Sequence, residues 1–507
     1  MNRFDFSAAI ADALKIMVPA MRQRLLQCCA LALIALGLAA CTTPGPDGWS
    51  AVEAGPLMYD YRLTLETGHE AGVFGPIFTE RHAGKDADAY TQRTIRPFLL
   101  WRSMDDGRSE EVDVLYPLLT YHRTGDEYRF QIMQLIGFSG GRHQVGGDEN
   151  STTLFPFYFS RDSGDPARDF RALFPIYGTM KNRMQRDRID FVLFPLYAKS
   201  QKRDVVTRNY LYPFFHVREG DRLRGWQFWP VMGREVKDYN PHAGAANPGG
   251  HTKSFFAWPF YSHAETGIGT DKHTTIDALL PLYSMRRSPQ RADTTILWPF
   301  FNYTADAANK YTEYSAPWPF IVWGDREGNG TKKSTHRVWP LFGREQRAEL
   351  TKEFYLWPLY QKHRLDTQSI LRERDRVLGV LYSRSHEVRK ETGEIRDRTD
   401  VWPLYSYKRT GATEYRQFPS LFEPLRPDNP GMERNYSPLV AIWRSESNSA
   451  TGVSSSSFLW HLVRTESSAK AEKCSLLFGL FRYKSNEEAR ELRLLWLLPI
   501  RWGGPAR

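Results

Sequence analysis

The chain has 507 residues, of which 41% are hydrophobic and 14% are aromatic, and its formal net charge at pH 7 is +10. A globular chain of this length would form about three domains, although repeat proteins do not follow that rule. The positive charge is spread through the predicted turns, which excludes one concentrated basic run and predicts a solvated rim. Attraction to anionic lipid headgroups or acidic glycans is the second interpretation of this charge.

Residues 1–40 are predicted to be a signal region. An apolar stretch runs from Leu25 to Ala40 and follows a short basic segment that starts at Met21. A basic segment, an apolar core of about 15 residues and a small-residue cleavage site are typical of a secretory signal rather than of a membrane-spanning helix. Because acidic residues occur among the first twenty positions, where such a signal should be basic, Met21 is predicted to be the true start.

The segment Leu38-Ala39-Ala40-Cys41 resembles the bacterial lipobox. In that lipoprotein family the cysteine is acylated and becomes the first mature residue, so the resemblance implies that Cys41 is the lipid anchor. Thr42 stands where an aspartate would imply retention in the inner membrane, so the resemblance implies the outer membrane, on its periplasmic or surface face. Residues 41–60 are then a lipidated linker. The alternative is an ordinary signal peptide with a chance cysteine.

Cysteine usage excludes a disulfide framework in the mature chain. Cys28 and Cys29 lie in the signal region, Cys41 is the predicted anchor, and Cys474 is the remaining cysteine. Stability must therefore come from packing, for which the chain offers 30 Phe, 25 Tyr and 15 Trp.

Residues 61–507 are predicted to be one repetitive all-β domain. A short phrase recurs about every 20 residues: an aliphatic residue, an aromatic residue, proline and two more large apolar residues, as in Leu356-Trp357-Pro358-Leu359-Tyr360. Self-similarity at a fixed period indicates stacked copies of one unit. The residues chosen to mark this structural repeat are Pro156, Pro195, Trp298, Pro299, Trp339, Pro340, Trp357, Pro358, Trp402 and Pro403.

Each copy of the phrase is predicted to be the centre of one β-strand, bounded by turns such as Ser163-Gly164-Asp165. Short turns favour antiparallel neighbours, so we expect a long up-and-down meander of about 22 strands. Alternation would put Leu356 and Tyr360 on one face of a strand and Trp357 and Leu359 on the other. Both faces would then be apolar, which predicts a curled or packed sheet, either propeller-like or closed, with most of the repeated aromatic side chains buried.

Motifs for catalysis and metal binding are weak, and neither a cofactor nor a metal site is predicted. Gly137–Gly141 matches a nucleophile-elbow pattern, but no helical pattern follows it, so a hairpin turn is expected. Asn240–Gly250 is predicted to be a mobile or binding loop. Four histidines lie around this loop without the spacing of a zinc signature, and they are His242, His251, His263 and His273.

The sequence therefore predicts a non-enzymatic scaffold or binding module anchored in the cell envelope. The expected partners are the membrane, through the N-terminal lipid, and an envelope protein, lipid or glycan; nucleic acid is not expected for an exported lipoprotein. An outer-membrane β-barrel for passage of lipid or solute is the alternative, although a proline in every strand would remove ladder donors that lipid cannot replace. A glycan-active enzyme is the third interpretation.

Overall fold

The computed structural model describes residues 57–143, 147–241, 249–308, 310–326, 333–427, 429–487, 489–496 and 498–503. The chain forms two compact units. Unit 1 holds the described residues before Leu154, together with Val380–Arg384 and those from Glu394 onwards. Unit 2 holds Leu154–Gly379 and Ser385–Gly393.

The structure consists of short strands, one 3₁₀ turn and one α-helix. From the start of the described chain to β19 the elements are β1 (Met58–Arg62), β2 (Gly68–Val73), β3 (Phe78–Ala83), η2 (Asp86–Asp88), β4 (Tyr90–Ile95), β5 (Leu99–Met104), β6 (Ser109–Val114), β7 (Leu119–Thr124), β8 (Glu127–Ile132), β9 (Ile136–His143), β10 (Gly147–Leu154), β11 (Tyr158–Asp162), β12 (Phe170–Leu173), β13 (Tyr177–Arg183), β14 (Arg186–Val192), β15 (Tyr197–Lys202), β16 (Val205–Tyr210), β17 (Phe215–Gly220), β18 (Leu223–Phe228) and β19 (Met232–Lys237). The later elements are β20 (Gly250–Phe256), β21 (Tyr261–Ile268), β22 (Thr274–Leu279), β23 (Tyr283–Arg287), β24 (Arg291–Ile296), β25 (Phe301–Asp306), β26 (Tyr311–Ser315), β27 (Ile321–Arg326), β28 (Lys333–Val338), β29 (Phe342–Arg347), β30 (Leu350–Tyr355), β31 (Tyr360–Asp366), β32 (Ile370–Val377), β33 (Tyr382–Arg389), β34 (Ile395–Val401), β35 (Tyr405–Thr410), β36 (Thr413–Phe418), α2 (Pro430–Val440), β37 (Trp443–Asn448), β38 (Val453–Phe458), β39 (Val463–Ser467), β40 (Ala471–Leu476), β41 (Phe481–Asn486), β42 (Arg490–Leu494) and β43 (Leu498–Trp502).

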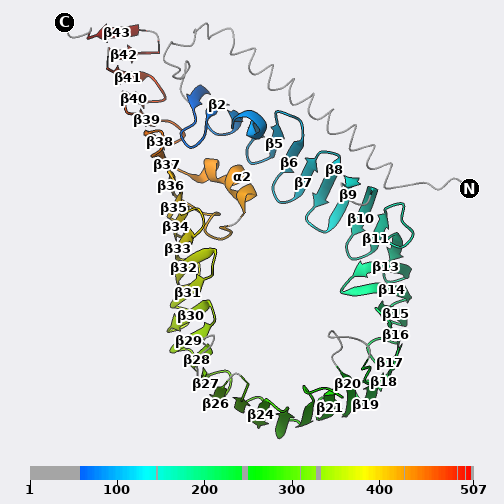
Figure 1. Ribbon diagram of the computed structural model, residues 1–507. Helices are drawn as coiled ribbons and strands as arrows, with labels where there is room; N and C mark the ends of the chain where they lie inside the picture. Colours follow the sequence, from blue (N-terminus) through cyan, green and yellow to red (C-terminus); the bar gives the residue numbers. More distant parts are fainter. Residues whose placement is uncertain are drawn as a thin grey trace, which may run out of the picture. The chain divides into compact units, whose positions relative to one another are not determined.

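The described strands form one antiparallel meander of 43 strands, in which each strand follows its sequence neighbour (Figure 1). In the β13–β14 hairpin, for example, Tyr177 lies opposite Val192 and Lys181 opposite Arg188. The predicted all-β up-and-down meander is confirmed. The predicted number of strands, about 22, is wrong because each repeat of about 20 residues folds as a hairpin of two short strands.

The predicted closed, curled or propeller-like sheet is wrong. β1 pairs with β2 and β43 pairs with β42, and no pairing within the described ranges joins these first and last strands. The prediction assumed that apolar side chains lie on both faces of each strand centre. Most of the large apolar side chains lie in the turns instead, so the strands carry no continuous apolar surface that requires closure or a second covering sheet.

The repeated phrase forms turns rather than strand centres. Between β30 and β31, the backbone N–H of Leu359 donates to the carbonyl oxygen of Leu356 at 2.7 Å. The Trp357–Pro358 peptide bond is cis, and a cis proline at the third position defines a type VI turn. Proline in this place removes no ladder donor, whereas in a strand centre it would.

Cis X–Pro bonds recur at the same kind of turn along the sheet. In the described residues the cis bonds precede Pro97, Pro117, Pro156, Pro175, Pro195, Pro213, Pro230, Pro259, Pro281, Pro299, Pro317, Pro319, Pro340, Pro358, Pro403 and Pro419.

Apolar and polar turns alternate along the chain. Connections from an even-numbered to an odd-numbered strand are rich in large apolar residues, as in the 297–300 turn between β24 and β25. Connections from an odd-numbered to an even-numbered strand are polar, as in Arg203-Asp204 between β15 and β16. Because successive turns of a meander lie at opposite edges of the sheet, each unit has one apolar edge and one polar edge.

Between the edges, the strands are short and largely polar. A six-residue strand spans about 20 Å, and β31, for instance, reads YQKHRLD. Buried apolar side chains form separate local clusters rather than one shared core. The cluster in unit 2 consists of Phe170, Ala172, Met180, Phe191 and Ala198, and two clusters in unit 1 consist of Leu63, Ala83 and Tyr90 and of Leu99, Trp101 and Val112.

Candidate functional site

Exposed aromatic and aliphatic side chains line the apolar edge. In unit 2, Phe157 is 62% exposed, Leu341 55%, Trp298 49% and Trp357 46%. The expectation that most repeated aromatic side chains are buried is wrong at these positions, because a turn residue projects beyond the ladder instead of facing a covering layer. This edge is the first candidate for an interaction surface.

The aromatic rings of neighbouring apolar turns touch one another. The ring centroids of Trp339 and Trp357 lie 5.7 Å apart, and those of Phe320 and Trp339 lie 5.6 Å apart. Neighbouring apolar turns are separated by two strands, or about 9.5 Å, a gap that large rings can bridge. The exposed rings therefore form a row along the edge rather than isolated hydrophobic spots.

The residues chosen from the sequence as marks of the repeat all lie in these turns. Cis peptide bonds precede Pro156, Pro195, Pro299, Pro340, Pro358 and Pro403, and the residues before the last four of these are Trp298, Trp339, Trp357 and Trp402. The indole N–H of Trp402 also donates to the carbonyl oxygen of Leu421 at 3.0 Å. The predicted lipid anchor Cys41, with the signal region before it, lies outside the described residues.

The serine-containing segment Gly137–Gly141 lies within strand β9. The hydroxyl of Ser139 is 3.1 Å from that of Ser151. The expected hairpin turn at this segment is therefore wrong. A nucleophile elbow also needs a sharp strand-to-helix turn, which a serine in a strand interior does not provide.

Three of the four histidines near the predicted loop lie beside carboxylates, and two of them, His263 and His273, share Glu265. His251 Nε2 lies 2.7 Å from Glu235 Oε1, and His263 Nδ1 lies 2.6 Å from Asp277 Oδ1. His273 is more distant from its carboxylate neighbour. The structure does not bring these three together as one ligand set. His242 and most of the loop around it fall outside the described ranges.

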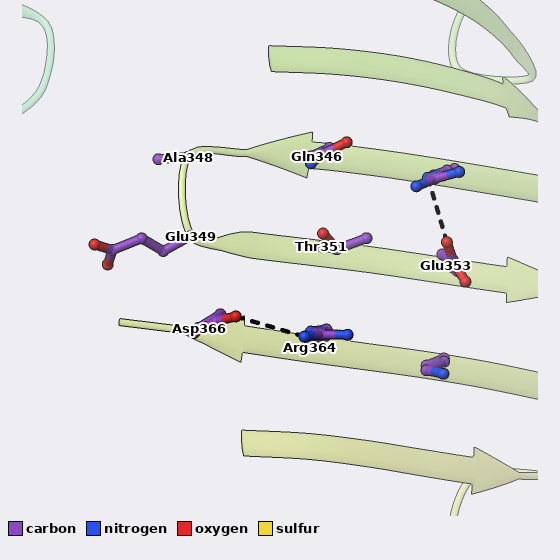
Figure 2. A pocket seen from close by; sticks show the side chains of 9 residues that line it. Gln346, Ala348, Glu349, Thr351, Glu353, Arg364 and Asp366 are labelled. Atoms are coloured by element: carbon purple, nitrogen blue, oxygen red, sulfur yellow. Dashed lines mark hydrogen bonds and ion pairs between the residues drawn. The ribbon is translucent and has the colours of Figure 1, made fainter. Parts of the chain in front are cut away.

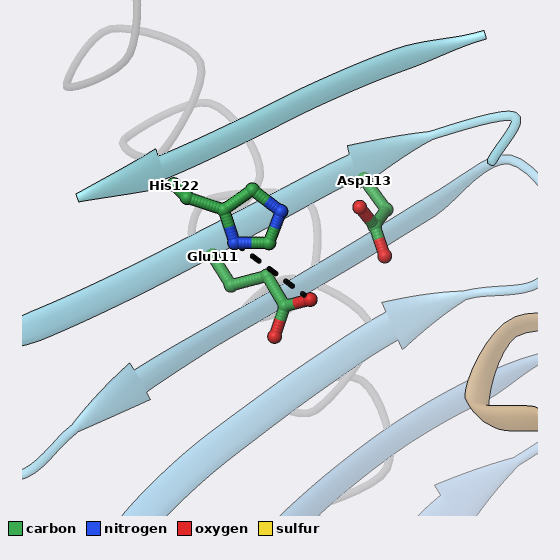
Figure 3. Close-up of side chains that lie close together, drawn as sticks. All are labelled: Glu111, Asp113 and His122. Atoms are coloured by element: carbon green, nitrogen blue, oxygen red, sulfur yellow. Dashed lines mark ion pairs between the residues drawn. The ribbon is translucent and has the colours of Figure 1, made fainter. Parts of the chain in front are cut away.

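Glu111, Asp113 and His122 form a polar cluster that sequence inspection missed (Figure 3). Glu111 and Asp113 share a face of β6, and His122 lies opposite Glu111 on β7, with its Nδ1 4.0 Å from a carboxylate oxygen. The register of the hairpin around Pro117 was the available signal, because counting back equally from that turn pairs position 111 with 122. Their ligand atoms all lie within 4.8 Å of one another.

This cluster anchors helix α2 rather than presenting a free ligand set. Arg434 forms a short ion pair with Glu111, and the side-chain amide of Asn435 donates to Asp113 Oδ2 at 3.0 Å. A metal ion would have to displace the guanidinium from Glu111, so the cluster is better suited to hold the helix.

The carboxyl group of Asp113 is fully buried. Burial raises its pKa to about 6, and the neighbouring Glu111 adds to this, while Asn435 and Arg434 oppose it. The second oxygen, Oδ1, has no hydrogen-bond partner. The contact between β6 and α2 therefore contains a carboxyl group that titrates near neutral pH.

A hollow of about 450 Å³ lies on strands β29 to β31 of unit 2 (Figure 2). Arg344 pairs with Glu353 at 3.3 Å, and Arg364 pairs with Asp366 at 3.5 Å. Both arginines therefore already have carboxylate partners on the sheet, which leaves them less available to a ligand.

No protein-family model and no curated protein sequence matches this chain. None of the helices in the described part of the chain combines the length and the hydropathy required to cross a bilayer.

Proposed function

We propose that this chain is a lipid-anchored, non-enzymatic scaffold or binding module of the bacterial cell envelope whose apolar edge lies in the lipid interface. The row of exposed aromatic turns along one edge of the sheet carries this proposal. The lipobox-like sequence ending at Cys41 supports it, because an acylated cysteine would bring the chain to the same lipid surface. Outer-membrane sorting, implied by Thr42, belongs to the same proposal.

The chemistry of the edge suits a membrane interface better than an aqueous surface. Tryptophan and tyrosine are enriched where a bilayer meets water, since their rings are apolar and their N–H and O–H groups remain hydrated. The strand faces behind the turns carry ion pairs such as Arg344–Glu353 and Arg208–Glu219, which belong in water. Only the turns would enter the lipid interface, while the strands would remain in the water outside it.

The free energy available is sufficient for stable attachment. A tryptophan side chain buries about 150–250 Å² when fully covered, so an indole that is half exposed, such as Trp298, offers about 100 Å² to lipid. At about 25 cal/mol per Å², each such ring contributes ~2–3 kcal/mol. Several turns together would supply the second membrane signal that a single acyl chain needs for stable anchoring.

The test uses the chain with Cys41→Ala, which removes the proposed acylation, and measures its co-sedimentation with phosphatidylethanolamine–phosphatidylglycerol vesicles. We expect saturable binding that the further double change Trp298→Ser, Trp357→Ser weakens on the order of 1,000-fold or more, because two rings together contribute ~4–6 kcal/mol. The matched control is Arg203→Ser, Arg222→Ser on the polar edge, which should change the affinity by less than about threefold.

Two outcomes would refute the proposal. One is a Cys41→Ala chain that stays in the supernatant at every vesicle concentration. The other is a tryptophan double variant that binds vesicles as tightly as the Cys41→Ala parent, while the polar-edge control binds them more weakly than that parent. Retained strand content by circular dichroism in both variants shows that the comparison concerns the edge and not the fold.

A further inference from the structure

A hollow of about 360 Å³ lies inside unit 1, between strands β2–β5 on one side and β35–β37 with α2 on the other. Contacts between residues far apart in the sequence hold its walls together. The Arg96 guanidinium donates through Nε to the carbonyl oxygen of Arg434 at 3.2 Å, which joins the first wall to helix α2. We call this hollow the polar chamber.

The chamber is lined by more cations than its carboxylates neutralise. Arg81 pairs with Glu66 at 2.5 Å and with Glu70 at 3.7 Å. Two further cations at the wall, one on β35 and one on α2, are also ion-paired: Lys408 pairs with Glu433 and Arg434 pairs with Glu111.

Three guanidinium groups of the lining have no carboxylate within ion-pair distance among the described residues: Arg96, Arg102 and Arg444. Of the lining carboxylates, Glu446 likewise has no ion pair in that part of the chain. Three unpaired positive charges therefore face one unpaired negative charge. Counted over the whole lining, six cations face five carboxylates, because Arg81 already holds two of these, so the chamber has an excess of one positive charge and suits an anion.

The environment of Arg96 shows that its charge is poorly compensated. Arg96 is 5% exposed and donates only to neutral oxygens, including the carbonyl oxygen of Pro76 at 2.9 Å. Burial lowers the pKa of Arg96. The Nε atoms of Arg444 and Arg81 are buried without a hydrogen-bond partner. Buried guanidinium donors left in this state are costly, and an anion that accepts their hydrogen bonds removes that cost.

Arginine and aromatic walls give the chamber the chemistry of a phosphate site. Guanidinium groups bind phosphate through paired N–H donors. The guanidinium of Arg102 lies over the ring of Tyr90, 3.9 Å from its centroid, and so has a defined orientation. The volume falls at the lower end of the range of small-molecule sites, which fits a phosphate group with a short substituent.

We propose that the polar chamber binds a small phosphate monoester, held by Arg96, Arg102 and Arg444. The phosphate comes either from a soluble molecule or from a lipid headgroup that is itself a phosphate monoester, since both present the same terminal phosphate group. This site is separate from the apolar edge, so a soluble phosphate can occupy it without membrane binding.

The test measures binding of inorganic phosphate and of glycerol 3-phosphate to the full-length lipidated chain in detergent, by calorimetry at constant ionic strength. We expect saturable binding by both and at least a tenfold loss of affinity in Arg444→Gln and in Arg102→Gln. Arg444→Lys should keep part of the affinity, because it retains the charge but not the paired donors. The matched control is Arg364→Gln, in the ion-paired hollow of unit 2, which should bind like the parent.

A second arm separates the two sources of phosphate. Vesicles containing phosphatidic acid, added to the phosphate-saturated chain, should release the bound phosphate if the headgroup enters the chamber, and should leave it bound if the ligand is soluble. Either result supports the chamber as the site. Absence of saturable phosphate binding, or equal affinity in Arg444→Gln and Arg102→Gln and the parent, overturns the proposal. If one of the two glutamine variants does not fold, the phosphate affinities of the other glutamine variant and of Arg444→Lys decide whether the chamber is the site.

Discussion

Replacing Asp113 with asparagine should remove a pH dependence from the docking of helix α2 on strand β6. Asp113 is fully buried, accepts a hydrogen bond from Asn435 at 3.0 Å, and has a pKa raised to about 6 by burial. In an open state the same carboxyl would titrate near 3.9. The state with α2 docked on β6 therefore binds the proton more tightly than the open state does. The stabilisation of the docked state by this proton is complete below about pH 4 and is lost as the pH rises through 6.

The size of the effect follows from the shift. A difference of about 2 pKa units corresponds to ~3 kcal/mol, or a factor on the order of 100 in the equilibrium for opening the α2 contact. An asparagine side chain at this position would have the same shape as the aspartate and no charge. We therefore expect Asp113→Asn to protect α2 about as well at pH 7.5 as the parent does at pH 4, with little difference between the two proteins at pH 4.

Hydrogen exchange measures this directly. Exchange rates of the amides of α2 and β6, corrected for the intrinsic pH dependence of exchange, give the opening free energy at each pH. The control is Asp190→Asn on β14 of unit 2, where the carboxylate pairs with Arg188 on the sheet and has no contact with α2. A parent whose corrected α2 protection is the same at pH 4 and pH 7.5 would falsify the reasoning, as would an equal pH dependence in Asp113→Asn.

Three further changes test the packing. Phe191→Ala should lower the free energy of unfolding of unit 2 by about 3–5 kcal/mol in urea denaturation, because the side chain is 2% exposed at the centre of a buried cluster; a loss below about 1 kcal/mol would contradict that role. Gly343→Val should cost about 1–3 kcal/mol in the same assay, since a Cβ there would lie 2.2 Å from the ring of Phe354, and the further change Phe354→Ala should recover part of it. Asn429→Ala should weaken α2 by about 1 kcal/mol in hydrogen exchange, because its side chain caps the helix by accepting from the Met432 N–H; unchanged exchange in the first turn would rule out that cap.

Local pattern was sufficient to predict the all-β class and the antiparallel meander. A period of about 20 residues with turn residues between apolar phrases predicts antiparallel neighbours, and the meander follows because short turns pair each strand with the next. The pattern did not indicate whether the repeated phrase lies in a strand or in a turn. Trp357 and Leu359 are apolar in a strand or in a turn, and a cis or trans bond before Pro358 cannot be read from the residues alone.

The candidate sites likewise combine features that the sequence indicated with features that only the tertiary structure shows. The proline and tryptophan positions of the apolar edge could be named from the sequence, although their exposure could not. The cluster around Asp113 needed the register of one hairpin and the position of α2, more than 300 residues later. The polar chamber needed two groups of strands from opposite ends of unit 1, and no local signal links Arg96 with Arg444.

The sequence by itself determined that this protein is a β-rich repeat in which apolar phrases alternate with polar turn segments, because the period of the residues sets the period of the backbone. Its lipobox-like segment predicts a lipid anchor at Cys41. Only the tertiary structure decided that the apolar phrase faces outward along an edge and that buried arginines converge in unit 1. The physical reason is that the hydrophobicity of a side chain shows only that it favours an apolar environment. The fold determines whether that environment is the protein's own interior or a surface outside the protein.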